Sequence, residues 1–163
     1  MDSNSSAYWI KHLGLQPHPE GGFYKEVFRS GIKVSKDSSL TKKNACTSIY
    51  YLLESNDFSA FHRLASDEIW YFHKGWPMAI HAISEDGIYT LHQLSDTAEG
   101  NLSVVIEAGI WFAAEIPSCS GFTLVSCAVA PGFDFAEFEM AELQTLANLY
   151  PQHTNLLQRL CRK

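Results

Sequence analysis

The sequence lacks the long apolar runs of membrane-spanning helices and the basic surplus of nucleic-acid-binding proteins. No stretch approaches the ~20 consecutive apolar residues that a spanning helix needs, so we expect no membrane partner. Lys and Arg together number 12 against 18 Asp and Glu, giving a formal net charge of −6, so we expect no nucleic-acid partner. Residues 1–6 are polar, without the basic-then-apolar order of a secretory signal, which predicts a cytoplasmic location.

Cysteine is also sparse. The four cysteines are scattered along the chain and form no CxxC pair, which excludes a small disulfide scaffold and favours reduced thiols. Aromatic side chains, by contrast, are abundant: ten Phe, seven Tyr and four Trp make up 13% of the 163 residues. That much aromatic surface suits a β-rich core or a lined pocket. The length predicts a single domain over residues 1–163.

Short runs of β-branched and aromatic residues follow one another at intervals of about ten residues, without helices between them, which predicts an antiparallel sandwich or barrel. A short helix precedes them around residues 6–13, and helices return over 141–161, so the β core covers about 10–140. The predicted fold is mainly β. The predicted strands are 23–29, 46–53, 59–64, 68–74, 78–83, 89–94, 104–107, 110–115 and 122–130.

The segment 61–75 has the densest combination of polar and aromatic side chains. Strand alternation places His62 and Leu64 on one face of a strand, and it places Glu68, Trp70 and Phe72 on one face of the next. A hairpin between these strands could bring an imidazole and a carboxylate together inside the barrel. A second cluster, EAGIWF at 107–112, combines a sharp bend with two aromatic residues.

These segments resemble the cupins. His62, Glu68 and Gly75 fall at the spacing of the first cupin motif, and residues 107–112 fall where cupins have their second motif. More closely, the chain resembles the cupin-5 (DUF985) family, whose members are mostly described only as predicted sugar epimerases. The resemblance implies a cupin-type jelly-roll β-barrel and a homodimer. The matching runs are 18–24, 48–53, 61–63, 66–70, 108–114 and 130–135.

The departures from the cupin pattern concern the metal. Metal-binding cupins hold the ion with three His and one Glu, whereas this chain has Leu64 and Phe112 at two of the His positions. His62 and Glu68 are the remaining metal candidates, and two ligands rarely hold a divalent ion tightly. We therefore expect no metal and no other cofactor.

Acid–base chemistry is the functional interpretation of His62 and Glu68. An imidazole can take a proton from a carbon beside a carbonyl, and metal-free cupin epimerases resemble such a site, with a His base and a Tyr acid. His62 is then the base and Glu68 orients it, while Tyr24 and Tyr51 are the candidate acids. The alternative is that His62 and Glu68 form a buried, hydrogen-bonded pair with no catalytic task.

Further residues are candidates for ligand binding. The arginines can hold an anion, the aromatic residues can stack on a ligand, and the carboxylates can lie at the pocket rim. Each also has a purely structural interpretation as a surface, core or turn residue. The ligand-binding candidates are Glu20, Phe23, Arg29, Arg63, Trp70, Phe72, Trp111, Phe112, Phe133 and Asp134.

Three functions remain open at this point. The first is a metal-independent isomerase or epimerase of a small sugar derivative, free or nucleotide-linked. The second is a non-catalytic cupin that binds a small molecule in an aromatic-lined pocket. The third is a metal-dependent dioxygenase, which Leu64 and Phe112 disfavour. We also expect a homodimer that uses the strand at 23–29, because paired strand edges are protected from further association.

Overall fold

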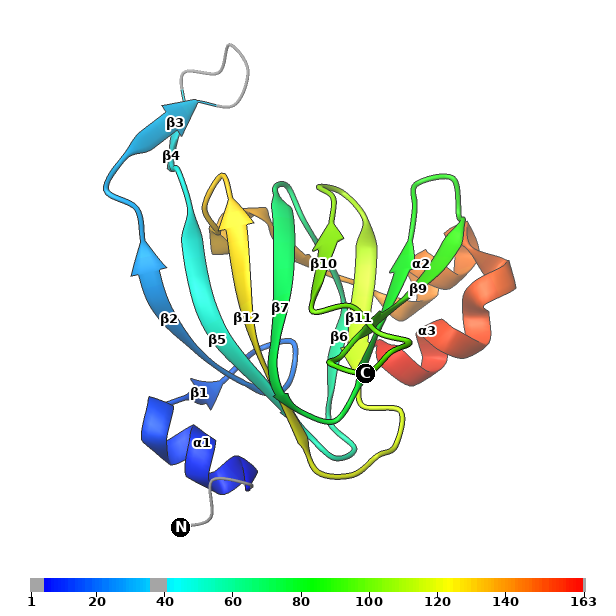
Figure 1. Cartoon of the computed structure of the whole chain (residues 1–163). Coiled ribbons are helices and arrows are strands. Elements are labelled where there is room, and N and C mark those ends of the chain that lie inside the picture. Colours follow the sequence, from blue (N-terminus) through cyan, green and yellow to red (C-terminus); the bar gives the residue numbers. More distant parts are fainter. Residues whose placement is uncertain (1–4, 36–40, 163) are drawn as a thin grey trace.

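Two facing antiparallel sheets form the core of the molecule (Figure 1). The structure is a computed structural model that describes residues 5–35 and 41–162. The first sheet has the strand order β1-β2-β5-β12-β7-β10, and the second has the order β13-β6-β11-β8-β9. The two sheets face each other as in a jelly roll and do not close into one continuous barrel, which refines the prediction.

All nine predicted strands are present, with ends that differ by at most a few residues. Four short strands, β1, β3, β4 and β13, were not predicted, and β3 and β4 form a separate two-stranded sheet. The strands are β1 (Gln16–Pro17), β2 (Phe23–Arg29), β3 (Lys33–Ser35), β4 (Lys42–Asn44), β5 (Thr47–Glu54), β6 (Phe58–Leu64), β7 (Asp67–Gly75), β8 (Met78–Ile83), β9 (Tyr89–Leu94), β10 (Ser103–Ile106), β11 (Trp111–Glu115), β12 (Phe122–Ala130) and β13 (Phe138–Met140).

The helices cover the outer faces of the two sheets (Figure 1). Helix α1 (Ser6–Leu13) begins at Ser5, whose side chain accepts the Tyr8 N–H, and ends at Gly14 in the left-handed conformation. Its apolar residues pack with Leu52 and Leu124 of the first sheet. The C-terminal elements are η1 (Phe135–Glu137), α2 (Leu143–Leu149), η2 (Pro151–His153) and α3 (Thr154–Leu160). None of the helices in the described part of the chain is long and apolar enough to cross a membrane.

Alternation along the strands divides the buried side chains between two cores. On β11, Phe112 faces the space between the sheets, whereas Trp111 faces the opposite side, where α2 and α3 pack. On β6, Phe61 joins the helix-covered core. Because its neighbours His62 and Leu64 have the opposite orientation, they face the space between the sheets, where the cavity lies.

Candidate functional site

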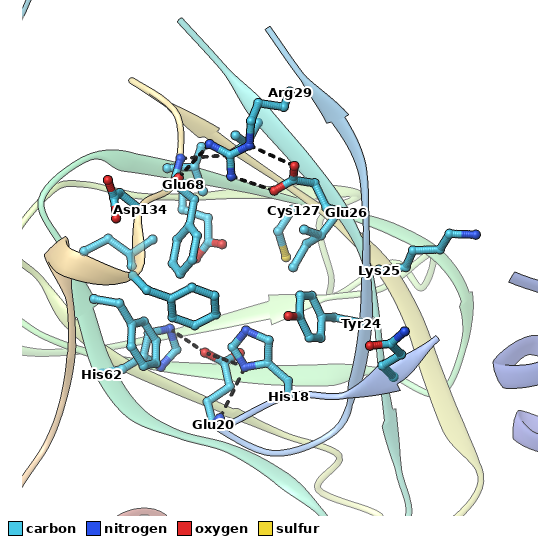
Figure 2. Close-up of a pocket in the computed structure, with 18 residues that line it drawn as sticks. His18, Glu20, Tyr24, Lys25, Glu26, Arg29, His62, Glu68, Cys127 and Asp134 are labelled. Atoms are coloured by element: carbon cyan, nitrogen blue, oxygen red, sulfur yellow. Dashed lines mark hydrogen bonds and ion pairs between the residues drawn. The ribbon is translucent and has the colours of Figure 1, made fainter. Parts of the chain in front are cut away.

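A cavity of about 420 Å³ lies between the two sheets and opens beside β2 and the segment 133–138 (Figure 2). Its volume is within the range of small-molecule sites. Residues of both sheets contribute to its wall, together with the turn that follows β1. The lining residues are Gln16, His18, Glu20, Tyr24, Lys25, Glu26, Arg29, Thr47, Ile49, His62, Leu64, Glu68, Cys127, Val129, Phe133, Asp134, Phe135 and Phe138.

The turn between β1 and β2 carries Glu20 to the base of the cavity. Gly21 has φ +117°, and a Cβ there would lie 2.1 Å from the Phe58 carbonyl oxygen, so only glycine fits. Gly22, at φ +70°, donates its N–H to Asp57 Oδ2 over 2.7 Å. The Ala60 N–H donates to the Glu20 carbonyl over 2.8 Å. These backbone contacts fix Glu20 beside β6, with only 6% of the residue exposed.

His62 is held in one tautomer by the backbone. Its Nδ1 lies 2.7 Å from the Ala60 carbonyl oxygen, which can only accept, so Nδ1 carries the proton. Neutral His62 therefore has an unprotonated Nε2, and this atom lies 3.2 Å from Glu20 Oε2 (Figure 2). Two bare acceptors would repel each other at this distance. One proton must therefore be held between the imidazole and the carboxyl group.

Burial favours the uncharged form of this pair. Removal from water lowers the pKa of His62 to about 4, since the ring is only 2% exposed. Burial also raises the pKa of the Glu20 carboxyl, and the nearby His18 opposes this shift. Both directions place the shared proton on Glu20, as a carboxylic acid that donates to His62 Nε2. Phe112 packs against the imidazole with ring centroids 4.2 Å apart and completes the support.

His18 lies on the other side of Glu20. The Glu20 N–H donates to His18 Nδ1 over 3.2 Å, so the neutral ring carries its proton on Nε2. Glu20 Oε2 lies 3.7 Å from the same Nδ1. Burial lowers the pKa of His18, so the neutral donor form predominates at neutral pH. Tyr24 packs edge-on against this ring, with centroids 4.5 Å apart.

Glu68 is a second buried carboxyl in the wall of the cavity. It is 6% exposed, and its Oε2 accepts the indole N–H of Trp70 over 3.0 Å. Burial raises the pKa of Glu68 to about 8. Glu68 is therefore mostly a neutral acid at pH 7. Cys127 lies in the same wall, and burial raises the pKa of its thiol.

The mouth of the cavity is braced by Arg29. Its Nε and Nη2 donate to the two oxygens of Glu26 over 2.9 and 2.7 Å, while Nη1 donates to Asn44 Oδ1 and to the Phe133 carbonyl oxygen. Asp134 caps η1 by accepting the Ala136 N–H. The rings of the segment 133–138 pack on one another, and Phe135 stacks on His18, so the mouth is largely aromatic.

The structure gathers seven of the predicted site residues around the cavity, from five separate segments of the chain. The sequence predicted that Glu68 would be the partner of His62, but the structure pairs His62 with Glu20. The turn at Gly21 places the Glu20 carboxyl beside His62, and Glu68 accepts a hydrogen bond from Trp70 instead. The seven residues are Glu20, Tyr24, Arg29, His62, Glu68, Phe133 and Asp134.

The remaining predicted residues are not among those that line the cavity. Phe23 packs under α1, because alternation on β2 turns it away from Tyr24. Arg63 pairs with Glu139 over 2.7 Å and stacks over Trp111, which faces the core beneath α2 and α3.

Four aromatic residues of the interior also lie behind the wall rather than in it. Tyr51 is fully buried and donates its hydroxyl to the Gly21 carbonyl over 2.7 Å, so it supports the turn instead of facing the cavity. Trp70, Phe72 and Phe112 belong to the apolar core between the sheets. Trp70 and Phe112 still act on the site, because they contact Glu68 and His62.

His18, Phe135 and Phe138 were not predicted as site residues. The signal for His18 was present, because it opens the run HPEGGFY that resembles the family, and its proximity to Glu20 follows from a two-residue separation. The positions of Phe135 and Phe138 depend on how the chain returns from β12 to β13, which no periodic pattern encodes.

The donor set does not fit a cupin metal. The positions beside His62 that would need imidazoles carry Leu64 and Phe112, and both nitrogens of His62 already have partners. Within 5–35 and 41–162, no three His, Cys, Asp or Glu side chains are arranged to hold a metal ion. The residues present therefore give no support for chemistry through a bound metal.

Comparison with known proteins identifies relatives of the whole chain. The model of the family described as "Cupin superfamily (DUF985)" matches residues 7–141. No curated protein matches the sequence. A hypothetical protein from Leishmania major has 34% identity and a TM-score of 0.91, with 98% of this chain and 100% of that chain covered.

Two further solved structures extend the comparison. A protein from Shewanella oneidensis has 38% identity and a TM-score of 0.88, with 99% of each chain covered. A cupin 2 domain-containing protein from Halorhodospira halophila has 13% identity and a TM-score of 0.59, with 91% of this chain and 88% of that chain covered. The last likeness concerns the fold alone.

Proposed function

We propose that this chain, which belongs to the DUF985 family of the cupin superfamily, is a metal-independent isomerase or epimerase of a small sugar derivative. The observation that carries the proposal is the 3.2 Å contact between His62 Nε2 and Glu20 Oε2, at the base of a cavity of about 420 Å³. A proton held between two buried groups in a ligand-sized cavity suits proton transfer.

The Glu20–His62 pair would act as the base. A substrate proton, released from a carbon beside a carbonyl, enters at Oε1 of Glu20, while the proton already on Oε2 moves to His62 Nε2. The backbone carbonyl of Ala60 stabilises the resulting imidazolium through Nδ1–H. The Nε2–H of His18 is available to donate to the substrate carbonyl oxygen as it gains charge.

Tyr24 is the candidate acid. In Figure 2 its hydroxyl points into the cavity from the side opposite His62. Delivery of a proton to the face opposite its removal would invert the carbon. Tyr51, the other tyrosine considered from sequence, has its hydroxyl proton committed to the Gly21 carbonyl.

A non-catalytic, small-molecule-binding cupin is the second candidate. The contacts of His62 with Ala60 and Glu20 also favour this function, because they give both ring nitrogens a protein partner before any ligand binds. A fully satisfied pair needs no catalytic task.

Deuterium exchange separates the two candidates. The protein is incubated in D₂O with a panel of reducing sugars, and proton NMR follows loss of the signal from the carbon beside the carbonyl. We expect exchange that falls by about 10²–10⁴ in His62→Asn, since a general base acts in the transition state. His92→Asn on β9, which does not line the cavity, is the matched control. Full exchange in a folded His62→Asn protein would exclude the catalytic role of His62.

A further inference from the structure

The cavity wall contains two Lys or Arg side chains, and both are already engaged. Arg29 uses Nε, Nη1 and Nη2 on Glu26, Asn44 and the Phe133 carbonyl. Lys25 turns away and donates its Nζ to the Leu13 carbonyl at the end of α1 over 2.9 Å. A phosphate or carboxylate that entered this cavity would therefore find no uncommitted Lys or Arg in its wall.

Carboxyl groups, in contrast, are in excess along the wall. Glu20 and Glu68 are each 6% exposed, and Asp134 lies at the mouth. Glu68 accepts the Trp70 indole through Oε2, and no described residue donates a hydrogen bond to its Oε1. One oxygen of this carboxyl thus remains available to a ligand, and the wall offers no uncommitted Lys or Arg to balance the charge of an anion.

Aromatic rings complete the surroundings. Tyr24 of β2 lines the cavity, and so do Phe133, Phe135 and Phe138. The three phenylalanine rings pack edge-to-face on one another, with centroid separations of 4.8 to 6.0 Å. Ring faces together with a carboxylate are the surroundings that recognise organic ammonium groups.

We infer that the ligand is an amino sugar, that is, a small polyol that carries a protonated amine and no phosphate, carboxylate or nucleotide group. This inference rests on the proposed function, which supplies the sugar scaffold of the ligand. It adds that the substituent on this scaffold carries a positive charge. The ammonium group pairs with Glu68, whose proton leaves to solvent as the ligand binds. The hydroxyls face Glu20, His18 and Tyr24.

Trp70 supplies a reporter for the experiment, because its indole N–H contacts the carboxyl that the amine would meet. The protein is labelled with ¹⁵N-tryptophan, and the Trp70 signal is assigned with Trp70→Phe. D-glucosamine, D-glucose, D-glucuronate and D-glucose 6-phosphate are titrated separately at pH 7. We expect glucosamine to shift the Trp70 signal with an affinity about tenfold to a hundredfold above that of glucose. The two anions should shift it least.

A variant tests the assigned contact. Glu68→Gln keeps the shape and an acceptor for Trp70, and it should bind glucosamine and glucose equally. If that variant does not fold, the four titrations of the unmodified protein still decide the question. Tighter binding of either anion than of glucosamine would overturn the inference, and so would the absence of a Trp70 shift with every sugar at its highest soluble concentration.

The two proposals fail separately. Glucosamine binding without deuterium exchange in any sugar keeps the amino-sugar inference and removes the catalytic function. Exchange in a sugar that carries a phosphate or carboxylate keeps the catalytic function and removes the amino-sugar inference.

Discussion

Replacing Glu68 by Gln should stabilise the protein, and the gain should grow with pH. In the folded protein burial raises the pKa of Glu68 from 4.5 to about 8. Between these values the unfolded chain releases the proton while the folded protein retains it, so ionisation favours unfolding and stability falls as pH rises. The amide introduced by Glu68→Gln does not ionise, and it keeps an acceptor for the Trp70 indole.

The size of the effect follows from the shift. A rise from 4.5 to about 8 is roughly 3.5 pH units, and each unit corresponds to about 1.36 kcal/mol, so the full difference is on the order of 5 kcal/mol. Between pH 4.5 and pH 8, the stability of Glu68→Gln relative to the unmodified protein should rise by about 4 kcal/mol. His62 titrates in both proteins, so its effect largely cancels in the comparison.

Urea unfolding followed by tryptophan fluorescence at the two pH values measures this difference. Glu107→Gln, at an exposed position before β11, is the matched control for the replacement of Glu by Gln. If Glu68→Gln gives a constant difference, Glu68 ionises in the folded protein as it does in water. That result would refute the assignment of Glu68 as a neutral acid in the folded protein.

Three further predictions concern the pair, the metal and the assembly. Glu20→Gln should keep the fold, because its amide can donate to His62 Nε2, but should abolish deuterium exchange; unchanged exchange would remove Glu20 from the relay. Purified protein should contain well under one equivalent of Zn, Fe, Mn or Ni, and dialysis against a chelator should leave exchange unchanged; tightly held stoichiometric metal would contradict this. Light scattering should detect a homodimer, and a persistent monomer at micromolar concentration would refute it.

The strands could be predicted because their alternation is written locally in the sequence. Glu68, Trp70 and Phe72 on β7 all face the space between the sheets, as their spacing of two residues requires. β13 has no such pattern of its own, because it is defined by pairing with β6, from Phe138 opposite Leu64 to Met140 opposite His62. Such pairing is a tertiary property, and neither composition nor periodicity specifies it.

The candidate site was predictable only in part, for a related reason. His62 could be found from its strand and motif, but its partner could not. The Glu20 carboxyl lies beside His62 because of the turn that follows it. In this turn the Gly22 N–H donates to Asp57, and the Gly21 backbone lies close to the Phe58 carbonyl oxygen. Those contacts join segments that are distant along the chain, so sequence spacing favoured the nearer Glu68 instead.

The close approach at Gly21 also supplies a marker for genome surveys. A side chain there would place its first carbon 2.1 Å from a backbone oxygen, which no rotamer change relieves. A relative with any other residue at this position must therefore carry a differently shaped turn, and its counterpart of Glu20 would lie elsewhere. Homologues that have Glu-Gly at the positions of Glu20 and Gly21, and His at the position of His62, are therefore expected to form this acid–imidazole pair. Homologues that lack one of these residues are expected not to form it.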